Sequence, residues 1–467
     1  MTDSTLKNAL YRTLRGKPTP LFIFEDRAIP AASVWSGTRQ WLNAMRTAGL
    51  DRGDRVVLAL EPSPEWLMVA LACLWDGYTL ALACPGERPA DAASSVQARL
   101  TISRRRNKPD RAGLPPKRFA LDTPSTPPSE RVALLLRTSG TTGEPRWIAL
   151  SEANITAVLE SHAPILADRP RTVLSVLPWH HAFGLVIDLL PAILGECTIV
   201  RDLSSGRDPE ALLRLARQYE CTSLSLVPMQ VRALMRTNAG QALLRSLDSG
   251  TVGGAPVDAE TAAFLGTTNL RPGYGLTEAG PGIALGTPGN WIAGAIGTPV
   301  GAEVGCETTI DAAGQLHFRG PNACLGEFEN GILVPAPSGW RPTGDVVEPT
   351  ADGSLRFLGR IDDDFKLGNG KMVRAAAAER ALRRALPLID VAVIPDGPDH
   401  IAVHATADEA APRPKPDDIR AAIGPLGSRV RRVTMLASSD MPRTPKGAID
   451  RRALANLELT EPIALAA

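Results

Sequence analysis

The apolar positions near the start of the chain follow helical spacing first and strand-like spacing next. Between residues 33 and 50, apolar side chains such as Trp41 and Met45 recur at helical intervals, which predicts an amphipathic helix. A polar turn at residues 51–54 leads into an apolar run of strand length at residues 55–60. This alternation of helix and strand indicates an α/β protein, in which helices cover both faces of parallel sheets.

A longer apolar run at residues 67–84 has about the length of a membrane-spanning helix. A break at residues 76–78, which contains an aspartate and a glycine, interrupts it. A buried helix at residues 65–75 followed by a strand at residues 79–84 explains the run better. We therefore expect no membrane span.

Further alternating segments extend this pattern over most of the chain. A chain of 467 residues exceeds the usual size of a single hydrophobic core, so we expect at least two domains. The later segments predict strands at residues 172–177, 197–200, 223–227, 391–394, 400–406 and 429–436, and helices at residues 209–220, 375–386 and 416–423.

The composition is that of an ordinary soluble enzyme. Hydrophobic residues make up 44% of the chain and charged residues 22%, and the net charge of +1 gives no indication of nucleic-acid binding. Six cysteines occur without Cys-x-x-Cys spacing, which argues against a zinc site or a disulfide framework. The N-terminal residues lack the pattern of a secretory signal, so we expect a cytoplasmic protein.

A loop of hydroxyls and glycines follows an apolar run at residues 131–137. Its glycines permit positive φ, so consecutive backbone N–H groups can converge on an anion, and its hydroxyls add donors. The loop lacks the Gly-Lys-Ser/Thr ending of a P-loop NTPase, and Arg146 is the first cation that follows it. A solvated turn after a strand is the alternative. The residues that we assign to phosphate binding are Thr138, Ser139, Gly140, Thr141, Thr142 and Gly143.

Four further motifs follow this loop: Gly253-Gly-Ala-Pro256, Tyr274-Gly-Leu-Thr-Glu278, Thr343-Gly-Asp345 and Gly359-Arg-Ile-Asp-Asp-Asp364. In this order, the five motifs together resemble the adenylate-forming superfamily of acyl- and aryl-CoA synthetases, peptide-synthetase adenylation domains and luciferases. The resemblance implies a large N-terminal domain of stacked α/β subdomains over residues 1–362. It also implies a small, mobile α+β C-terminal domain over residues 363–467.

The resemblance assigns adenosine binding to three of these motifs. The small residues of the first motif would let the flat adenine ring lie against the backbone, and Tyr274 would stack on the opposite face. Asp345 would accept hydrogen bonds from both ribose hydroxyls. Arg360 would place a positive charge near the ribose or the phosphates. The nucleotide-binding residues beyond the phosphate loop are then Gly253, Gly254, Ala255, Tyr274, Gly275, Asp345, Arg360 and Lys371, the last in a glycine-rich hairpin.

Three other residues are assigned to the reacting groups. Thr277 would reach the α-phosphate, and Glu278 would hold Mg²⁺, which takes few carboxylates in addition to phosphate oxygens. The segment Leu177-Pro-Trp-His-His-Ala-Phe-Gly184 matches a family pattern in which His181 lines the acyl pocket. The alternative for Thr277 and Glu278 is an exposed turn, and the alternative for His181 is a core histidine.

The last motif departs from the family. Pro442-Arg-Thr-Pro-Lys-Gly-Ala-Ile-Asp-Arg451 resembles a signature in which a lysine directly follows the glycine, but Ala448 occupies that position here. Lys446, two residues earlier, is our candidate for the catalytic lysine. In the phosphate loop, Arg146 and Trp147 likewise replace the usual Lys-Gly pair.

The sequence therefore predicts a ligase that uses ATP and Mg²⁺ to convert an aryl or fatty acid to an acyl-adenylate. The acceptor would be a thiol of coenzyme A or of a carrier protein's phosphopantetheine arm. Two alternatives remain: a catalytically weakened nucleotide- and acid-binding homologue, indicated by Ala448, and a non-enzymatic subunit that docks a carrier protein through arginines at residues 104–106 and 429–432.

Overall fold

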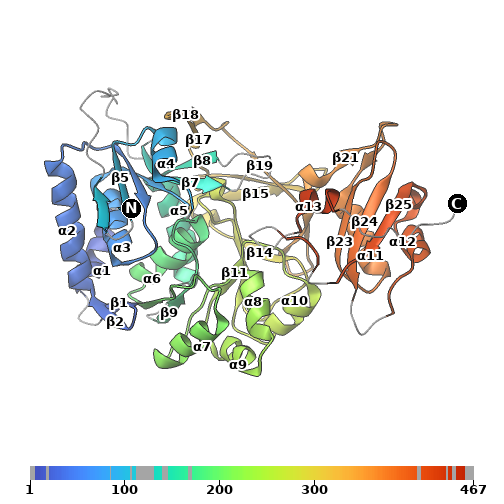
Figure 1. The fold of residues 1–467 in the computed structure, drawn as a ribbon, viewed down its shortest axis with the longest axis horizontal. Coiled ribbons are helices and arrows are strands. Elements are labelled where there is room, and N and C mark those ends of the chain that lie inside the picture. Colours follow the sequence, from blue (N-terminus) through green and yellow to red (C-terminus); the bar gives the residue numbers. More distant parts are fainter. Residues whose placement is uncertain are drawn as a thin grey trace.

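A computed structural model of the chain shows an elongated molecule with the N-terminal helices and strands at one end and the C-terminal ones at the other (Figure 1). The structure describes residues 6–16, 20–84, 86–105, 108–111, 131–138, 146–166, 171–407, 412–437, 440–443 and 449–457.

An eight-stranded sheet forms the end of the molecule that carries the N-terminus. Its inner strands β7, β4, β3 and β5 are parallel, whereas β8 runs antiparallel to β7. Strands β3, β4 and β7 are mostly apolar, as expected for strands that are covered on both faces of the sheet. The strand order is β18 (Ile332–Pro335), β17 (Gly326–Glu329), β8 (Arg146–Ser151), β7 (Val132–Thr138), β4 (Thr79–Leu82), β3 (Arg55–Ala59), β5 (Leu100–Arg105) and β6 (Lys108–Arg111).

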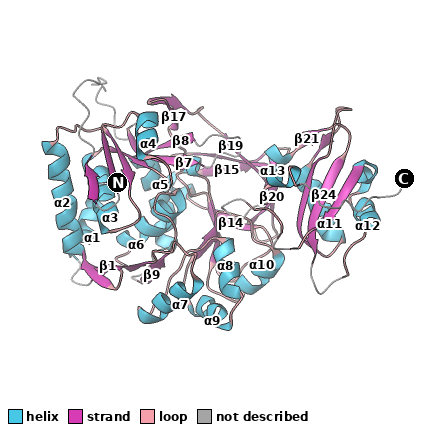
Figure 2. Ribbon diagram, in the orientation of Figure 1, coloured by secondary structure: helices cyan, strands magenta, loops and turns pink. Residues whose placement is uncertain are grey.

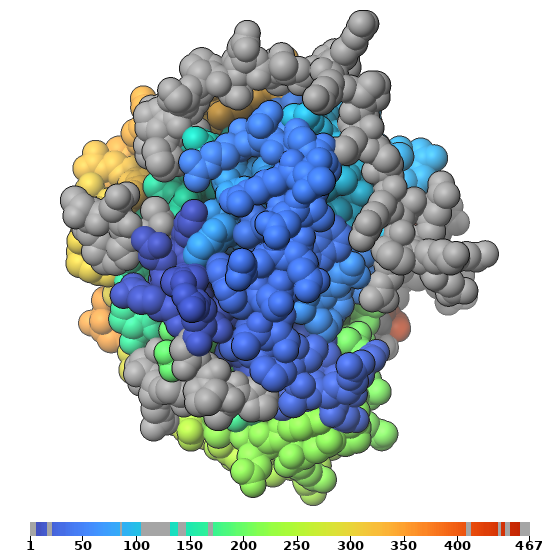
Figure 3. Space-filling view, turned by 90° about the vertical axis from the view of Figure 1, so that its left-hand side faces the viewer, coloured from blue at the N-terminus to red at the C-terminus, as the bar shows by residue number. Residues whose placement is uncertain are grey.

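Helices flank this sheet (Figure 2). Helices α2 (Ala31–Thr47), α3 (Pro64–Asp76) and α5 (Glu152–Leu166) share the largest apolar core with one face, and α4 (Pro89–Val96) packs on the other. The predicted helix at residues 65–75 is thus confirmed as a buried helix. The first hundred residues, coloured blue, make up most of the surface at this end (Figure 3). No helix among the described residues is long and apolar enough to cross a membrane.

A four-stranded sheet lies beside this unit and carries a second apolar core. Within it, β1, β10 and β9 are parallel. The predicted strand at residues 223–227 forms only isolated bridges, which join β9 to β11. The elements are β2 (Arg27–Pro30), β1 (Pro20–Phe24), β10 (Thr198–Arg201) and β9 (Thr172–Ser175), with helices α7 (Pro209–Gln218), α8 (Pro228–Met235), α9 (Asn238–Ser246) and α10 (Ala259–Leu265).

The third sheet differs from our expectation of parallel strands. Only β11 and β12 pair in parallel, and every later pair is antiparallel. Antiparallel strands need only short connections, and no crossover helix separates the later strands of this sheet. The strand order is β11 (Thr251–Gly253), β12 (Arg271–Tyr274), β13 (Ala284–Leu285), β14 (Ala295–Pro299), β20 (Leu355–Arg360), β19 (Arg341–Pro349), β16 (Gln315–Arg319) and β15 (Glu307–Ile310).

The C-terminal residues form a separate small unit with its own apolar core (Figure 1). All five elements predicted after residue 363 are present, each within a few residues of its predicted bounds. A short hairpin precedes them, as the glycines at residues 368 and 370 predicted. The elements are β21 (Phe365–Lys366), β22 (Met372–Val373), α11 (Ala375–Ala385), β23 (Leu388–Pro395), β24 (Ile401–Ala407), α12 (Pro416–Ala422), β25 (Val430–Met435) and α13 (Arg451–Ala455). The domain boundary at residue 362 stays a prediction.

Candidate active site

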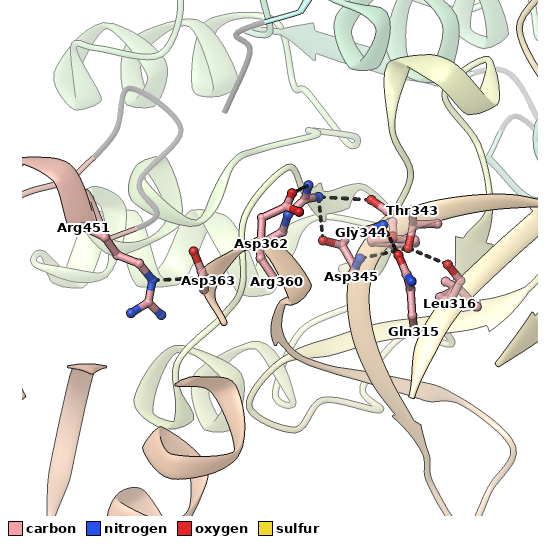
Figure 4. Close-up of polar contacts among 10 residues, drawn as sticks. Gln315, Leu316, Thr343, Gly344, Asp345, Arg360, Asp362, Asp363 and Arg451 are labelled. Atoms are coloured by element: carbon pink, nitrogen blue, oxygen red, sulfur yellow. Dashed lines mark hydrogen bonds and ion pairs between the residues drawn. The ribbon is translucent and has the colours of Figure 1, made fainter. Parts of the chain in front are cut away.

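Asp345 lies at the centre of the candidate site, where three of the predicted nucleotide-binding residues meet. Its Oδ2 accepts a hydrogen bond from the Tyr274 hydroxyl at 2.6 Å, and its Oδ1 accepts one from Arg360 Nη1 at 2.8 Å. The Arg360 contact follows from strand register, because Asp345 in β19 lies opposite Arg360 in β20. Figure 4 shows this pair together with the network behind it.

The backbone around Asp345 is fixed by its neighbours (Figure 4). Thr343 Oγ1 accepts from the Asp345 N–H at 3.0 Å and donates to the Leu316 carbonyl at 2.8 Å. Gln315 Oε1 accepts from the Gly344 N–H at 3.1 Å, where the backbone is left-handed with φ of 75°. Glycine adopts this conformation without steric cost, so the Thr-Gly-Asp motif bends inside β19 and turns the carboxylate toward the site.

Burial and charge oppose each other at this cluster. Burial raises the pKa of Asp345, and the Arg360 charge and the Tyr274 hydroxyl partly offset this effect. Burial, followed by the Asp345 charge, raises the pKa of Tyr274 well above its usual value, so its hydroxyl keeps the proton that it donates. Burial disfavours the Arg360 charge, but its pKa is raised because Asp345 and Asp362 outweigh that effect.

The glycines predicted to face adenine are required by close backbone contacts. A Cβ on Gly253 would lie 2.6 Å from the Gly273 carbonyl oxygen, and one on Gly275 would lie 1.5 Å from the Pro281 carbonyl oxygen. Gly254 is exposed and left-handed, with φ of 85°. These contacts explain the glycines without a ligand. Adenine binding at Gly253, Gly254, Ala255 and Gly275 therefore stays a prediction.

Thr277 and Glu278 lie in a 3₁₀ turn, η2 (Thr277–Ala279), directly after the strand that carries Tyr274. Both side chains are half-buried. The Glu278 carbonyl accepts a hydrogen bond from the Cys324 N–H at 2.8 Å. No group of three carboxylate, histidine or cysteine side chains that could hold a metal occurs in the described part of the chain. Magnesium binding by Glu278 stays a prediction.

His181 lies in the loop between β9 and a π-helix, η1 (Phe183–Leu189). Its ring centroid is 4.4 Å from that of His180, which is buried and whose pKa burial lowers to about 3. His180 is thus a neutral core residue. A Cβ on Gly253 would lie 3.7 Å from the Phe183 ring, so the histidine loop adjoins the glycine motif.

The phosphate loop is described only at its edges. Thr138 ends β7, and its Oγ1 is buried without a hydrogen-bond partner in the described structure. Arg146, the first cation after the loop in sequence, is paired with Glu327 of β17. Trp147 is buried in the core under α4 and donates from Nε1 to Ser95 Oγ at 2.8 Å. The assigned residues Ser139, Gly140, Thr141, Thr142 and Gly143 lie outside the described residues.

Lys446 and Ala448 also lie outside the described residues. On their flanks, Arg443 and Ile449 form an antiparallel bridge. Arg451, which ends the signature, contacts Asp363 through Nε at 3.0 Å and Glu379 through Nη1 at 2.7 Å. Figure 4 shows the first of these pairs beside the site.

Lys371 is exposed in the hairpin between β21 and β22, and its backbone N–H donates to Asn369 Oδ1 at 3.0 Å. Its role toward phosphate stays a prediction. The sequence interpretation missed Gln315, Cys324 and Glu379, whose partners lie far away along the chain. Gln315 and Cys324 contact backbone groups, and Glu379 pairs with an arginine 72 positions away. No local motif marks such contacts.

The sequence profile described as AMP-binding enzyme matches residues 15–326. The chain belongs to this family. The match covers the phosphate loop, the glycine motif and the Tyr274–Glu278 turn, and it ends before Asp345.

Known relatives of the chain include plant proteins named as CoA ligases. A probable CoA ligase, CCL5, from Humulus lupulus is 28% identical over 358 residues, which cover 70% of this chain and 64% of that protein. A 4-coumarate–CoA ligase-like protein 8 from Arabidopsis thaliana is 24% identical over 515 aligned positions, with 96% and 91% coverage.

The fold matches that of a solved adenylate-forming enzyme. The anthranilate CoA ligase AuaEII in complex with anthranoyl-AMP aligns with a TM-score of 0.74 at 19% identity, over 97% of this chain and 96% of that one. This likeness confirms the predicted α/β architecture with a large N-terminal and a smaller C-terminal domain.

Proposed function

We propose that this protein is an ATP-dependent acid–thiol ligase. The observation that carries the proposal is the convergence of Tyr274 and Arg360 on the Asp345 carboxylate, with the three residues contributed by three strands of one sheet. Each carboxylate oxygen accepts one protein hydrogen bond and keeps a second lone pair free. Both ribose hydroxyls of ATP can therefore donate to a carboxylate that the protein already holds in place.

The reaction joins two anions. A carboxylate oxygen of the acid bonds to the α-phosphorus of ATP, and the bond from that phosphorus to pyrophosphate breaks. Repulsion between the anions must be offset by donors and cations fixed in advance. The phosphate loop from Thr138 to Gly143 and the Thr277 hydroxyl supply the donors, and His181 lines the side where the acid enters.

Magnesium fits the residues present. Glu278 offers one half-buried carboxylate, and Mg²⁺ in nucleotide sites typically binds one or two carboxylates and completes its shell with phosphate oxygens and water. When bound, the ion would neutralise charge on the phosphates. Glu278 and Thr277 lie in the same turn, Thr277–Ala279, so one short segment carries both the carboxylate and the hydroxyl.

Lys446 is proposed to supply the remaining positive charge. Residues 446 and 448 are two positions apart, so in an extended segment they project to the same side about 6.6 Å apart, at about 3.3 Å per residue. A lysine side chain can span that shift. With Lys446 in the role of the missing lysine, the chain could retain activity although Ala448 occupies the usual lysine position.

The acid is proposed to be an aryl or fatty acid, and the acceptor a thiol of coenzyme A or of a carrier protein. The names of the plant relatives support coenzyme A. The adenylate in the AuaEII structure supports an aryl acid. A phosphopantetheine arm presents the same thiol chemistry, so a carrier protein is the competing acceptor.

Residues 363–467 are proposed to move as a domain between adenylation and thiol transfer. Their separate core supports this proposal. Asp362, at the proposed hinge, is exposed and pairs with Arg360 at 3.1 Å. One ion pair between the units is Arg380 Nη1 with Glu348 Oε2 at 2.9 Å, and such half-exposed pairs contribute about 1 kcal/mol or less. This ion pair could therefore break during the proposed domain movement at a small cost in free energy.

Trapping with hydroxylamine tests the proposal. Purified protein, ATP and Mg²⁺ are incubated with a panel of aryl and fatty acids, and hydroxamate and pyrophosphate are measured together. The ligase should release pyrophosphate only with the right acid. A weakened homologue would bind ATP without acid-dependent release, and a docking subunit would bind a carrier protein without needing ATP.

A further inference from the structure

One short turn, residues 320–324, holds both ends of the segment that begins at Glu278. The Cys324 N–H donates to the Glu278 carbonyl at 2.8 Å, and Asn322 Nδ2 donates to the Gly282 carbonyl at 3.0 Å. Asn322 is almost fully buried. The turn therefore sets the position of the backbone that carries Glu278.

The turn is itself fixed from the first sheet. Asn154, at the start of α5, donates through Nδ2 to the carbonyls of Pro321 at 2.8 Å and Ala323 at 2.9 Å. Ser151 in turn fixes Asn154, because the Ser151 N–H donates to Asn154 Oδ1 at 2.8 Å. These contacts involve only neutral groups, and none of them reaches Cys324.

Arg341 provides a charged contact to Cys324. Its Nη1 donates to the Cys324 carbonyl at 2.6 Å and lies 3.3 Å from the Cys324 sulfur. Arg341 is the first residue of β19, the strand that carries Asp345, and it lies opposite Phe318 of β16. One guanidinium thus connects the strand of the ribose carboxylate to the turn that holds Glu278.

Burial of the guanidinium has a cost. Arg341 Nε is buried and lacks a hydrogen-bond partner within the described structure, and an apolar side chain at this position would avoid that cost.

We propose that Arg341 is a positioning residue for Glu278, and through it for the metal-bound phosphates. This inference rests on the proposed function. Arg341 donates to the Cys324 carbonyl, and the Cys324 N–H donates to the Glu278 carbonyl. These two hydrogen bonds fix the position of the Glu278 carboxylate relative to Asp345. Arg341 itself contacts neither nucleotide nor acid.

The test compares Arg341→Ala and Arg341→Lys with the wild type in acid-dependent pyrophosphate release at varied Mg²⁺. Arg341→Ala should raise the half-saturating Mg²⁺ concentration and lower kcat, each about tenfold, the scale of losing one hydrogen bond from a charged donor. The KM for the acid should change less than about twofold. Arg341→Lys should restore much of the loss, because one ammonium can still reach the Cys324 carbonyl.

Arg319→Ala is the matched control. Arg319 lies next to Phe318 in β16, is exposed, and pairs with Glu307 at 2.7 Å. Its loss should leave the Mg²⁺ titration unchanged. Thermal unfolding checks that each variant is folded. If Arg341→Ala does not fold, Arg341→Met replaces it with the same expected shift, because methionine keeps an apolar stem but has no donor for the Cys324 carbonyl.

An unchanged Mg²⁺ titration in a folded Arg341→Ala variant would overturn the inference, as would a shift confined to the acid KM. If the wild type releases no pyrophosphate with any acid, the proposed function fails by itself. Calorimetric binding of ATP at varied Mg²⁺ then still compares the variants. An equal Mg²⁺ dependence of ATP binding in wild type and Arg341→Ala would overturn the positioning role separately.

Discussion

Replacing Asp345 by alanine should weaken ATP binding without unfolding the protein. The wild-type carboxylate is buried and accepts hydrogen bonds from Tyr274 and Arg360. If it also accepts both ribose hydroxyls, alanine removes two hydrogen bonds to a charged acceptor, at about 1.5 kcal/mol each. The expected loss is about 3 kcal/mol, or about 100-fold in the dissociation constant of ATP.

The structure explains why the variant should still fold. Arg360 keeps a second partner, Asp362 at 3.1 Å, so its charge is not left isolated. The Tyr274 hydroxyl loses its acceptor, which costs about 1–3 kcal/mol if the group stays buried without a partner. Asp345→Asn keeps the volume of the side chain and separates the loss of charge from the loss of shape.

Calorimetry with ATP is the assay, and thermal unfolding is the check on folding. Asp91→Ala is the matched control, because Asp91 is exposed on α4 and pairs only with Arg88 at 2.8 Å among the described contacts. The control should bind ATP as the wild type does. Unchanged ATP affinity in folded Asp345→Ala would refute the assignment of Asp345 to the ribose.

Three further predictions concern the metal, the lysine and pH. Glu278→Gln should raise the Mg²⁺ concentration needed for half-maximal activity, because the amide keeps an acceptor oxygen but loses the charge; lower activity with an unmoved Mg²⁺ titration would assign Glu278 another role. Lys446→Ala should slow adenylation by roughly 10²–10³, the scale of one charge-stabilising donor, and spare thiol transfer from a preformed adenylate; full adenylation by this variant would eliminate Lys446 as the catalytic lysine. Burial lowers the pKa of His404 to about 4, against about 6.5 in the unfolded chain. Between pH 6.5 and pH 4 the unfolded chain binds a proton at His404 that the folded protein excludes. The free energy of unfolding is therefore highest above pH 6.5 and falls towards pH 4 by about 1.4 kcal/mol per pH unit. His404→Leu should flatten this fall in urea unfolding measured as a function of pH; an equal slope in the wild type and in His404→Leu would contradict the assignment.

The sequence predicted most of the local elements and the order of the motifs. Helix α3 was predictable because Asp76 and Gly77 end an apolar run, and Gly77 adopts the left-handed C-cap that glycine favours. The helices and strands of the C-terminal unit were predictable because each carries its own apolar period, whereas the division into two domains was implied by the family resemblance.

The arrangement of the third sheet was not predictable from local patterns. Strands β16, β19 and β20 are short and mix polar with apolar residues, and their antiparallel pairing depends on partners far along the chain. The direct contact of Tyr274 with Asp345 likewise joins residues 71 positions apart. The motifs identified both residues, but stacking on adenine was the only role predicted for Tyr274, and its hydroxyl contact was missed.

The anchoring of Glu278 was hidden for a different reason. Cys324 acts through its backbone N–H and carbonyl, which every residue except proline carries, so its side chain gives no signal. Arg341 is equally ordinary in sequence, since its role depends on the register between β16 and β19.

Acid-dependent pyrophosphate release tests the central claim most directly. With ATP, Mg²⁺, hydroxylamine and the panel of aryl and fatty acids, the wild type should form hydroxamate and pyrophosphate in equal amounts with at least one acid, and neither product without acid. Tight ATP binding with no pyrophosphate from any acid would contradict the claim, and a large gain of activity in Ala448→Lys would then identify a weakened homologue.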